Sequence, residues 1–183
     1  VNTGLINSED GLVTVNADIF DNSHDVQSKG IMTLNVNELD NSADISSLSN
    51  LNINGVNSVL SGELKSSVDM NINLTGSLTL DNSAAKIIGS ASGSGTTSIS
   101  ANDVDNDGVI HSGNVLELTS PTINNSKSAA ISSLGDLTIS GDELYNQGLI
   151  YSNLNMNLNL SNEVNNDSDG QTALSGDIYA NNN

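Results

Sequence analysis

The stretch GDLTISGDELYNQGLIYS, residues 135–152, places small or apolar residues at regular intervals. Its segments 137–139, 144–146 and 150–152 each carry two such residues separated by one polar residue. Alternation with a period of two is typical of a β-strand with one buried side. The stretch therefore predicts three short strands, separated by the turn-forming residues Gly, Asn and Asp.

The same pattern recurs along the chain. The asparagine of the second strand recurs from Asn22 to Asn41, and the apolar residue of the third from Val26 to Ile45, both 19 residues apart. A fixed period of this kind indicates a repeat architecture. One repeat cannot bury its own apolar side, so successive repeats must stack and cover one another.

The predicted fold class is all-β, a right-handed parallel β-helix (solenoid) of about nine coils with a period near 19 residues. Right-handed connections are the rule between parallel strands. Residues 1–183 form a single β-helix segment, with irregular coils expected near 75–96 and 126–131, where the pattern breaks. At ~4.8 Å per coil, the rod would be on the order of 40 Å long. Both ends fall within a repeat, so we expect a segment excised from a longer rod.

The asparagine within each repeat is expected to play a structural role. Asparagine adopts turn conformations readily and bonds to nearby backbone groups, and stacked carboxamides can bond to one another along a ladder. We therefore predict a ladder of asparagines at one corner of the coil. Its members are Asn22, Asn41, Asn82, Asn106, Asn125, Asn146 and Asn166.

Composition excludes several classes of partner. The formal net charge is −18, from 22 acidic residues against only four basic ones. Nucleic acid is not expected as a partner, because phosphate binding requires clustered Lys or Arg. No apolar run is long enough for a membrane-spanning helix, so no membrane insertion is expected. The chain has no cysteine, which excludes disulfides and thiolate metal sites. We expect a monomer.

The pattern G-x-L-x-I-x-A-x-x-L-x-N-x-G-x-I-x-S resembles the filamentous haemagglutinin repeat of two-partner-secretion exoproteins. The match is best at 12–55, 97–125 and 135–160. That family includes adhesins and contact-dependent growth inhibition proteins of Gram-negative bacteria. The resemblance implies export through an outer-membrane transporter. It also implies a secreted or cell-surface location in a fibre linked to virulence.

Three functions are compatible with such a rod. The first is a structural shaft that presents a distal adhesive or toxic element to other cells. The alternative is a module of the same fibre that binds a target-cell receptor or glycan directly. The third is a carbohydrate-active β-helix enzyme, which the absence of arginine and the scattered lysines disfavour. We therefore expect no enzyme, no catalytic residue and no cofactor.

One motif resembles the start of a calcium loop. Asp103, Asp105 and Asp107 precede Gly108, but the twelfth loop position is Asn114 where the motif needs a glutamate. We expect no metal site, although the motif leaves calcium binding open. The two histidines, at positions 24 and 111, have no partner at a motif spacing.

Alternation also predicts which residues point outward. Tyr145 and Tyr151 are expected outside, where exposed tyrosines are common contact anchors, and they are the candidate binding residues. Two polar rows should lie side by side on one outer surface. The first row is Thr14, Thr33, Asn52, Asn71, Ser98, Glu117, Thr138 and Asn157; the second is Asn16, Asn35, Asn54, Asn73, Ser100, Thr119, Ser140 and Asn159. Such rows could bind glycans.

Overall fold

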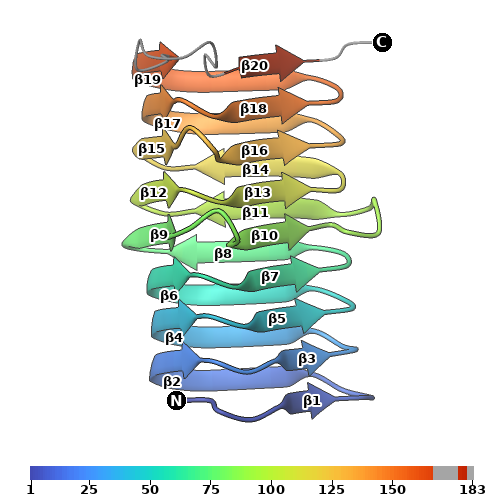
Figure 1. Ribbon diagram of the computed structural model, residues 1–183. Coiled ribbons are helices and arrows are strands. Elements are labelled where there is room, and N and C mark those ends of the chain that lie inside the picture. The colour runs from blue at the N-terminus through green and yellow to red at the C-terminus, as the bar shows by residue number, and fades with distance from the viewer. Residues whose placement is uncertain (167–176, 181–183) are drawn as a thin grey trace.

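The computed structural model describes residues 1–166 and the backbone of residues 177–180. These residues form strands, turns and bends, stacked as a right-handed parallel β-helix (Figure 1). The predicted fold class is therefore confirmed, with parallel strand pairs and a regular step of 19 residues. The described part of the chain offers no helix long and apolar enough to cross a membrane.

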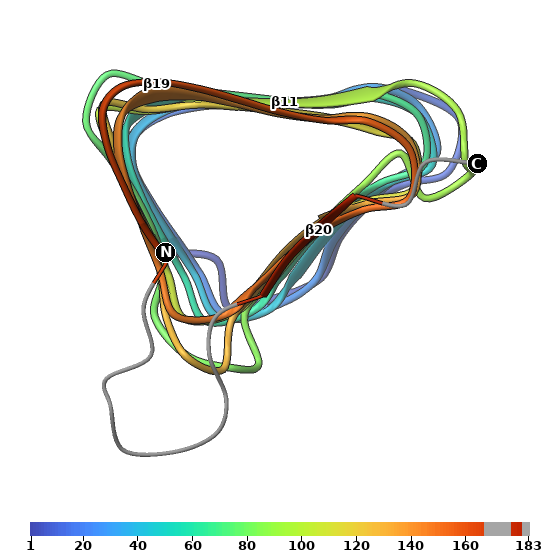
Figure 2. The ribbon, with the colours of Figure 1, turned by 90° about the horizontal axis from the view of Figure 1, so that it is seen from above.

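The coil has a triangular cross-section with three faces (Figure 2). Faces 1 and 2 belong to one 11-stranded sheet. In five coils a single strand runs along both faces: β2 (Val13–Asn22), β4 (Met32–Asn41), β6 (Leu51–Leu60), β17 (Leu137–Asn146) and β19 (Met156–Asn166). In three coils it divides into a face 1 strand and a face 2 strand: β8 (Met70–Leu74) and β9 (Ser77–Leu80), β11 (Thr96–Ser100) and β12 (Asp103–Asn106), and β14 (Val115–Thr119) and β15 (Thr122–Asn125).

Face 3 is a separate nine-stranded sheet. Its strands are β1 (Ile6–Ser8), β3 (Val26–Ser28), β5 (Asp44–Ser47), β7 (Glu63–Ser66), β10 (Lys86–Gly89), β13 (Val109–Ser112), β16 (Ala130–Ser133), β18 (Leu149–Ser152) and β20 (Asp177–Ala180).

The sequence predicts three short strands in each repeat, but their hydrogen bonds form two sheets. The structure has three faces but two sheets, because the long strands bend at the corner between faces 1 and 2 without losing their pairing. Strand β6 pairs with β8 along face 1 and with β9 along face 2, which keeps the sheet continuous where the strand divides. A sharp bend replaces the predicted turn at this corner.

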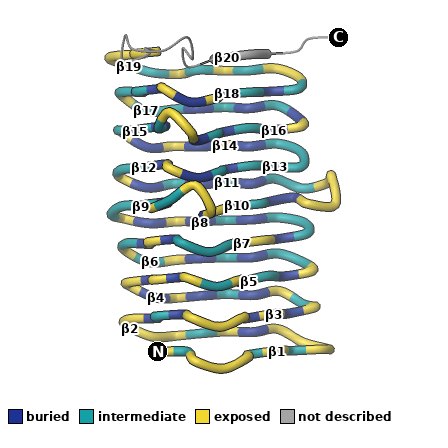
Figure 3. The backbone as a smooth tube through the Cα atoms, viewed as in Figure 1, coloured by how far each residue is buried: buried dark blue, intermediate teal, exposed yellow. Residues whose placement is uncertain are grey.

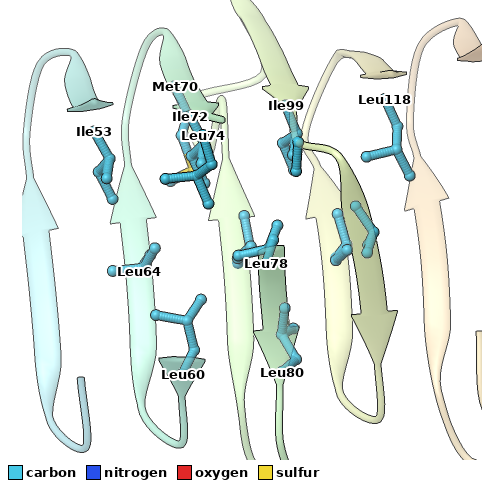
Figure 4. Close-up of a cluster of buried hydrophobic side chains, with 14 of the residues drawn as sticks. Ile53, Leu60, Leu64, Met70, Ile72, Leu74, Leu78, Leu80, Ile99 and Leu118 are labelled. Carbon is cyan, nitrogen blue, oxygen red and sulfur yellow. The ribbon is translucent and has the colours of Figure 1, made fainter. Parts of the chain in front are cut away.

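The core is a set of apolar rows along the rod axis. Buried and exposed residues alternate along most strands (Figure 3), and Ile45, Ile110 and Ile150 are all 0% exposed, as predicted. Each inward residue packs on its register partner in the next coil, as Ile53 does on Ile72 (Figure 4). Stacking thus supplies the burial that one coil lacks.

The coil between β7 and β11 is longer than its neighbours. The backbone N–H of Thr96 donates to Oδ1 of Asp69, 27 residues earlier, whereas regular coils contact at 19. One extra residue lies at the corner between β8 and β9, and the others lie in two corner loops, 81–85 and 90–95, which protrude from the triangle in Figure 2. Ser90 in the second loop has a φ of 51°, and Gly93 and Gly95 also have positive φ. Extra length is therefore confined to corners, and the strands keep their register.

The asparagine ladder occupies the inner corner at the end of face 2, in two segments. In the first, Nδ2 of Asn22 donates to Oδ1 of Asn41 at 2.7 Å. In the second, Asn106 donates to Asn125 at 2.8 Å and Asn125 donates to Asn146 at 2.7 Å. Asn146 then donates to Asn166 at 2.7 Å. Asn22, Asn41, Asn106, Asn125 and Asn146 are all at most 1% exposed.

Asn82 does not belong to the ladder, and this prediction was wrong. Leu80 occupies the ladder position of its coil, paired with Leu60 on one side and Asn106 on the other. Asn82 instead lies in the following corner loop, where its Oδ1 accepts the N–H groups of Ala84 and Ala85 at 2.8 and 3.0 Å. The two leucines interrupt the ladder and separate its segments.

Buried serines occupy a second inner corner, at the end of face 3. Oγ of Ser47 donates to the carbonyl of Gly30 at 2.8 Å, and Oγ of Ser133 to that of Gly135 at 2.8 Å. Ser58 on face 2 is different: it is 1% exposed, lies between Leu39 and Leu78, and its Oγ has no hydrogen-bond partner within the described structure. Burial of an unpaired hydroxyl costs free energy.

The ladder predicts a contrast between inward and outward asparagines. Replacing Asn125 with Leu removes two buried amide bonds and leaves Asn106 and Asn146 with unpaired groups, so we expect a loss of about 1–3 kcal/mol in unfolding free energy. Asn157 is an exposed asparagine of β19, and Asn157→Leu should change stability by within ~0.5 kcal/mol. Urea unfolding of both variants measures the difference. Equal losses would contradict the inward assignment.

The unpaired hydroxyl predicts a stabilising substitution. Ser58→Ala should raise the unfolding free energy by about 1 kcal/mol, because it removes a buried polar group that lacks a partner. Ser133→Ala is the matched control and should lower it by about 0.5–1.5 kcal/mol, because its hydroxyl is bonded. Thermal and urea unfolding measure both. A loss of stability in Ser58→Ala would show that this hydroxyl has a partner.

Candidate functional site

Face 1 is flat and almost free of charge. Its two outward rows follow the predicted register from coil to coil. Nδ2 of Asn35 donates to Oδ1 of Asn16 at 2.8 Å, and Asn54 donates to Asn35 at 3.0 Å. Glu117 is the only charged residue in these two rows. The asparagines of coils β2 to β8 therefore bond to one another along the rod axis, and the face presents a regular array of amides and hydroxyls.

Face 2 carries a much larger share of the negative charge. Its strands contain acidic residues from several coils and no lysine. Besides Asp18 and Asp142 at the corner with face 1, the acidic side chains are Asp21, Glu38, Asp40, Asp103, Asp105, Glu143 and Glu163. Two outer surfaces of one rod therefore differ sharply in electrostatic character, although they share one backbone sheet.

The aspartates of the DxDxDG motif lie along the outside of face 2. Asp103 and Asp105 point outward from β12, and Asp107 lies in the turn that follows. Nδ2 of Asn124 donates to Oδ1 of Asp105 at 2.8 Å, and Oγ of Ser126 donates to Asp107. Burial and the nearby Asp105 carboxylate raise the pKa of Asp103. The carboxylates are thus spaced along a strand and the turn after it, and Asp105 and Asp107 bond to the next coil instead of converging with Asp103 on one point.

No group of three or more His, Cys, Asp or Glu side chains in the described part of the chain could hold a metal ion. His111 lies on face 3, where its Nδ1 is 2.9 Å from Oγ of Ser132. Burial lowers the pKa of His111, and no carboxylate contributes to the shift. A serine–histidine pair without an orienting carboxylate lacks one element of the hydrolytic triad. His24 lies in the exposed corner between β2 and β3.

The two candidate tyrosines lie on different faces. Tyr145 projects from face 2, and its hydroxyl donates to Oε2 of Glu143 at 3.0 Å. Tyr151 projects from face 3, and its hydroxyl donates to Oδ1 of Asn153 at 3.1 Å. Both are partly exposed. The structure therefore does not bring them together into one contact surface.

Tyr145 borders a surface hollow at the corner between faces 2 and 3. The hollow has a volume of about 280 Å³. Its lining residues come from three successive coils: Asn124, Asn125, Ser126, Tyr145, Gln147 and Asn165. Of these, the sequence singled out only Tyr145 and the ladder residue Asn125. The register places Asn124, Tyr145 and Asn165 in one outward column, so the repeat contained a signal for this grouping.

The aspartate geometry predicts no response to calcium. We expect millimolar calcium to leave the melting temperature unchanged, because the three carboxylates point along an open face without a shared centre. Calorimetric titration and thermal unfolding, with and without a chelator, measure this. A saturable signal at micromolar calcium that disappears in Asp105→Ala would contradict the expectation.

Comparisons of the chain with protein-family models, with curated proteins and with solved structures gave no match.

Proposed function

We propose that this chain is a structural rod of a secreted bacterial surface exoprotein, in which it holds a distal adhesive or toxic element away from the producing cell. Its repeat resembles the filamentous haemagglutinin repeat of two-partner-secretion proteins. On this proposal, an outer-membrane transporter exports the chain and the rod stands on the surface of a Gram-negative cell. The rod acts through its length and stiffness.

The observation that carries the proposal is the continuous bonding along the rod axis. Each of the three faces is hydrogen-bonded from coil to coil, and the buried asparagines add side-chain bonds in the same direction. One apolar row runs through the interior of face 3 without interruption, from Val26 to Ile150. A repeat bonded in this way resists bending and can be lengthened by adding coils.

Charge and composition also support export and display. A net charge of −18 keeps an elongated molecule soluble and discourages association between copies. The absence of cysteine means that a chain crossing membranes unfolded cannot form premature cross-links.

The proposal predicts that the number of coils matters more than the chemistry of the outer faces. In the native producing cell, deletion of residues 32–50 removes one coil of regular length and joins equivalent positions, so the fold and surface display should persist. Surface display is measured by antibody binding to intact cells. Attachment to target cells should fall progressively as coils are deleted, because the distal element moves closer to the producing cell.

A matched control variant keeps the length of the rod and changes the outer surface of face 1. Replacing Asn16, Asn35, Asn54 and Asn73 on face 1 with Ser should leave attachment unchanged, because the rod keeps its length. Normal display with lost attachment in this variant would instead support a module that binds its target directly. Retention of the chain inside the cell would contradict the proposal altogether.

A further inference from the structure

We propose that the hollow beside Tyr145 binds an uncharged oligosaccharide through the tyrosine ring and a set of carboxamides. This inference goes beyond the rod function and does not depend on it. A rod without a binding site would still act as a spacer, so the two proposals can fail separately.

The shape of the hollow comes from an unusual corner. The loop 126–129 follows β15, and the turn at Gln147 and Gly148 lies directly on it. A side chain at Gly148 would approach the carbonyl oxygens of Ser126 and Ala129 to 2.4 Å, so the two corners touch only because Gly148 has none. This contact sets the loop and the Tyr145 strand side by side and leaves a concave surface between them.

Tyr145 supplies a fixed aromatic surface at the edge of the hollow. Its ring lies in an outward column between Asn124 and Asn165, and the bond to Glu143 holds its hydroxyl. That hydrogen bond, with burial and the charges of Glu143 and Glu163, raises the pKa of Tyr145, so the phenol stays protonated as a donor. An aromatic side chain with an apolar body and a polar tip suits a sugar, which has apolar C–H surfaces between hydroxyls.

The other lining side chains are of two kinds: one is held by hydrogen bonds within the protein at the base of the hollow, and others are available to bind a ligand. Asn125 forms the floor, because its carboxamide is committed to Asn106, Asn146 and the carbonyl of Leu149. The side chains of Gln147 and Asn165 make no hydrogen bond with other described residues. Each free carboxamide offers two donor hydrogens and an acceptor oxygen. Such groups can pair with neighbouring sugar hydroxyls, each of which both donates and accepts.

The negative charge around the hollow favours uncharged sugars over anionic ones. Asp105 and Asp107 bond directly to lining residues Asn124 and Ser126, and Glu143 bonds to Tyr145. Loop 126–129 also carries one cation, Lys127, but the three carboxylates outnumber it, so anionic glycans such as sialylated, sulfated or uronate-containing chains are repelled on balance. A volume of about 280 Å³ lies at the small end for a ligand pocket, so one or two sugar units would occupy it.

The test uses the whole chain and an array of immobilised oligosaccharides, in neutral and anionic matched pairs, followed by calorimetry on the strongest binder. We expect binding to neutral members only. Tyr145→Ala and Gln147→Ala should each weaken the affinity by about tenfold or more. Tyr151→Ala is the matched control, since it removes a second partly exposed tyrosine from another face, and it should leave the affinity unchanged.

Melting temperatures of all three variants establish that each is folded, and Gln147 is exposed, so its truncation should not disturb the coil. Three outcomes would overturn the proposal. These are no binding to any neutral member of the array, stronger binding to anionic members, or equal losses in Tyr151→Ala and Tyr145→Ala.

Discussion

Parallel hydrogen bonding between successive coils is the interaction on which the rest of this structure depends. A slip of one residue in any strand would turn its inward row outward and expose the core. The register is therefore fixed, whereas the corners can vary in length. In the long coil between β7 and β11, loops 81–85 and 90–95 contain most of the extra residues, yet Leu64 still pairs with Ile87 and Met70 with Thr97.

The buried asparagines follow from the same constraint. A coil that bends sharply leaves inward space at the end of face 2 that must be filled in every coil. An asparagine inside the ladder is satisfied by bonds to its neighbours, as Asn125 is by Asn106 and Asn146. Leu60 and Leu80 show the other solution, since the two adjacent leucines pack on each other without polar groups. The ladder position therefore tolerates either chemistry, because backbone groups bond to the asparagines that face a leucine, as the carbonyl of Ala43 accepts from Asn41 and the N–H of Gly108 donates to Asn106.

The fold and most of the inward and outward residues could be predicted from the sequence, because the same register recurs in almost every repeat. The inward isoleucines and both outward rows of face 1 follow directly from the period of 19. Asn82 could not be placed in this way. The string Asp-Asn-Ser occurs at 21–23, 40–42 and 81–83, each time with an apolar residue immediately before it. The pairing between strands determines whether Asn82 lies in the ladder. Alignment of Asn82 with the ladder would shift Leu78 out of the core. In the observed register, Leu78 and Leu80 are both 0% exposed.

The candidate site was less predictable, for a related physical reason. Alternation shows that Tyr145 points outward, but the hollow beside it depends on how loop 126–129 meets Gly148, and corners do not obey the repeat. Stacking restricts which residues can occupy the interior of a solenoid, whereas the residues of the outer faces need only keep the rod soluble. Face 1 can thus be nearly neutral and face 2 acidic on one continuous sheet. Specific chemistry in such a rod is best sought at irregular corners, where the chain departs from its period and concave surfaces can form between coils.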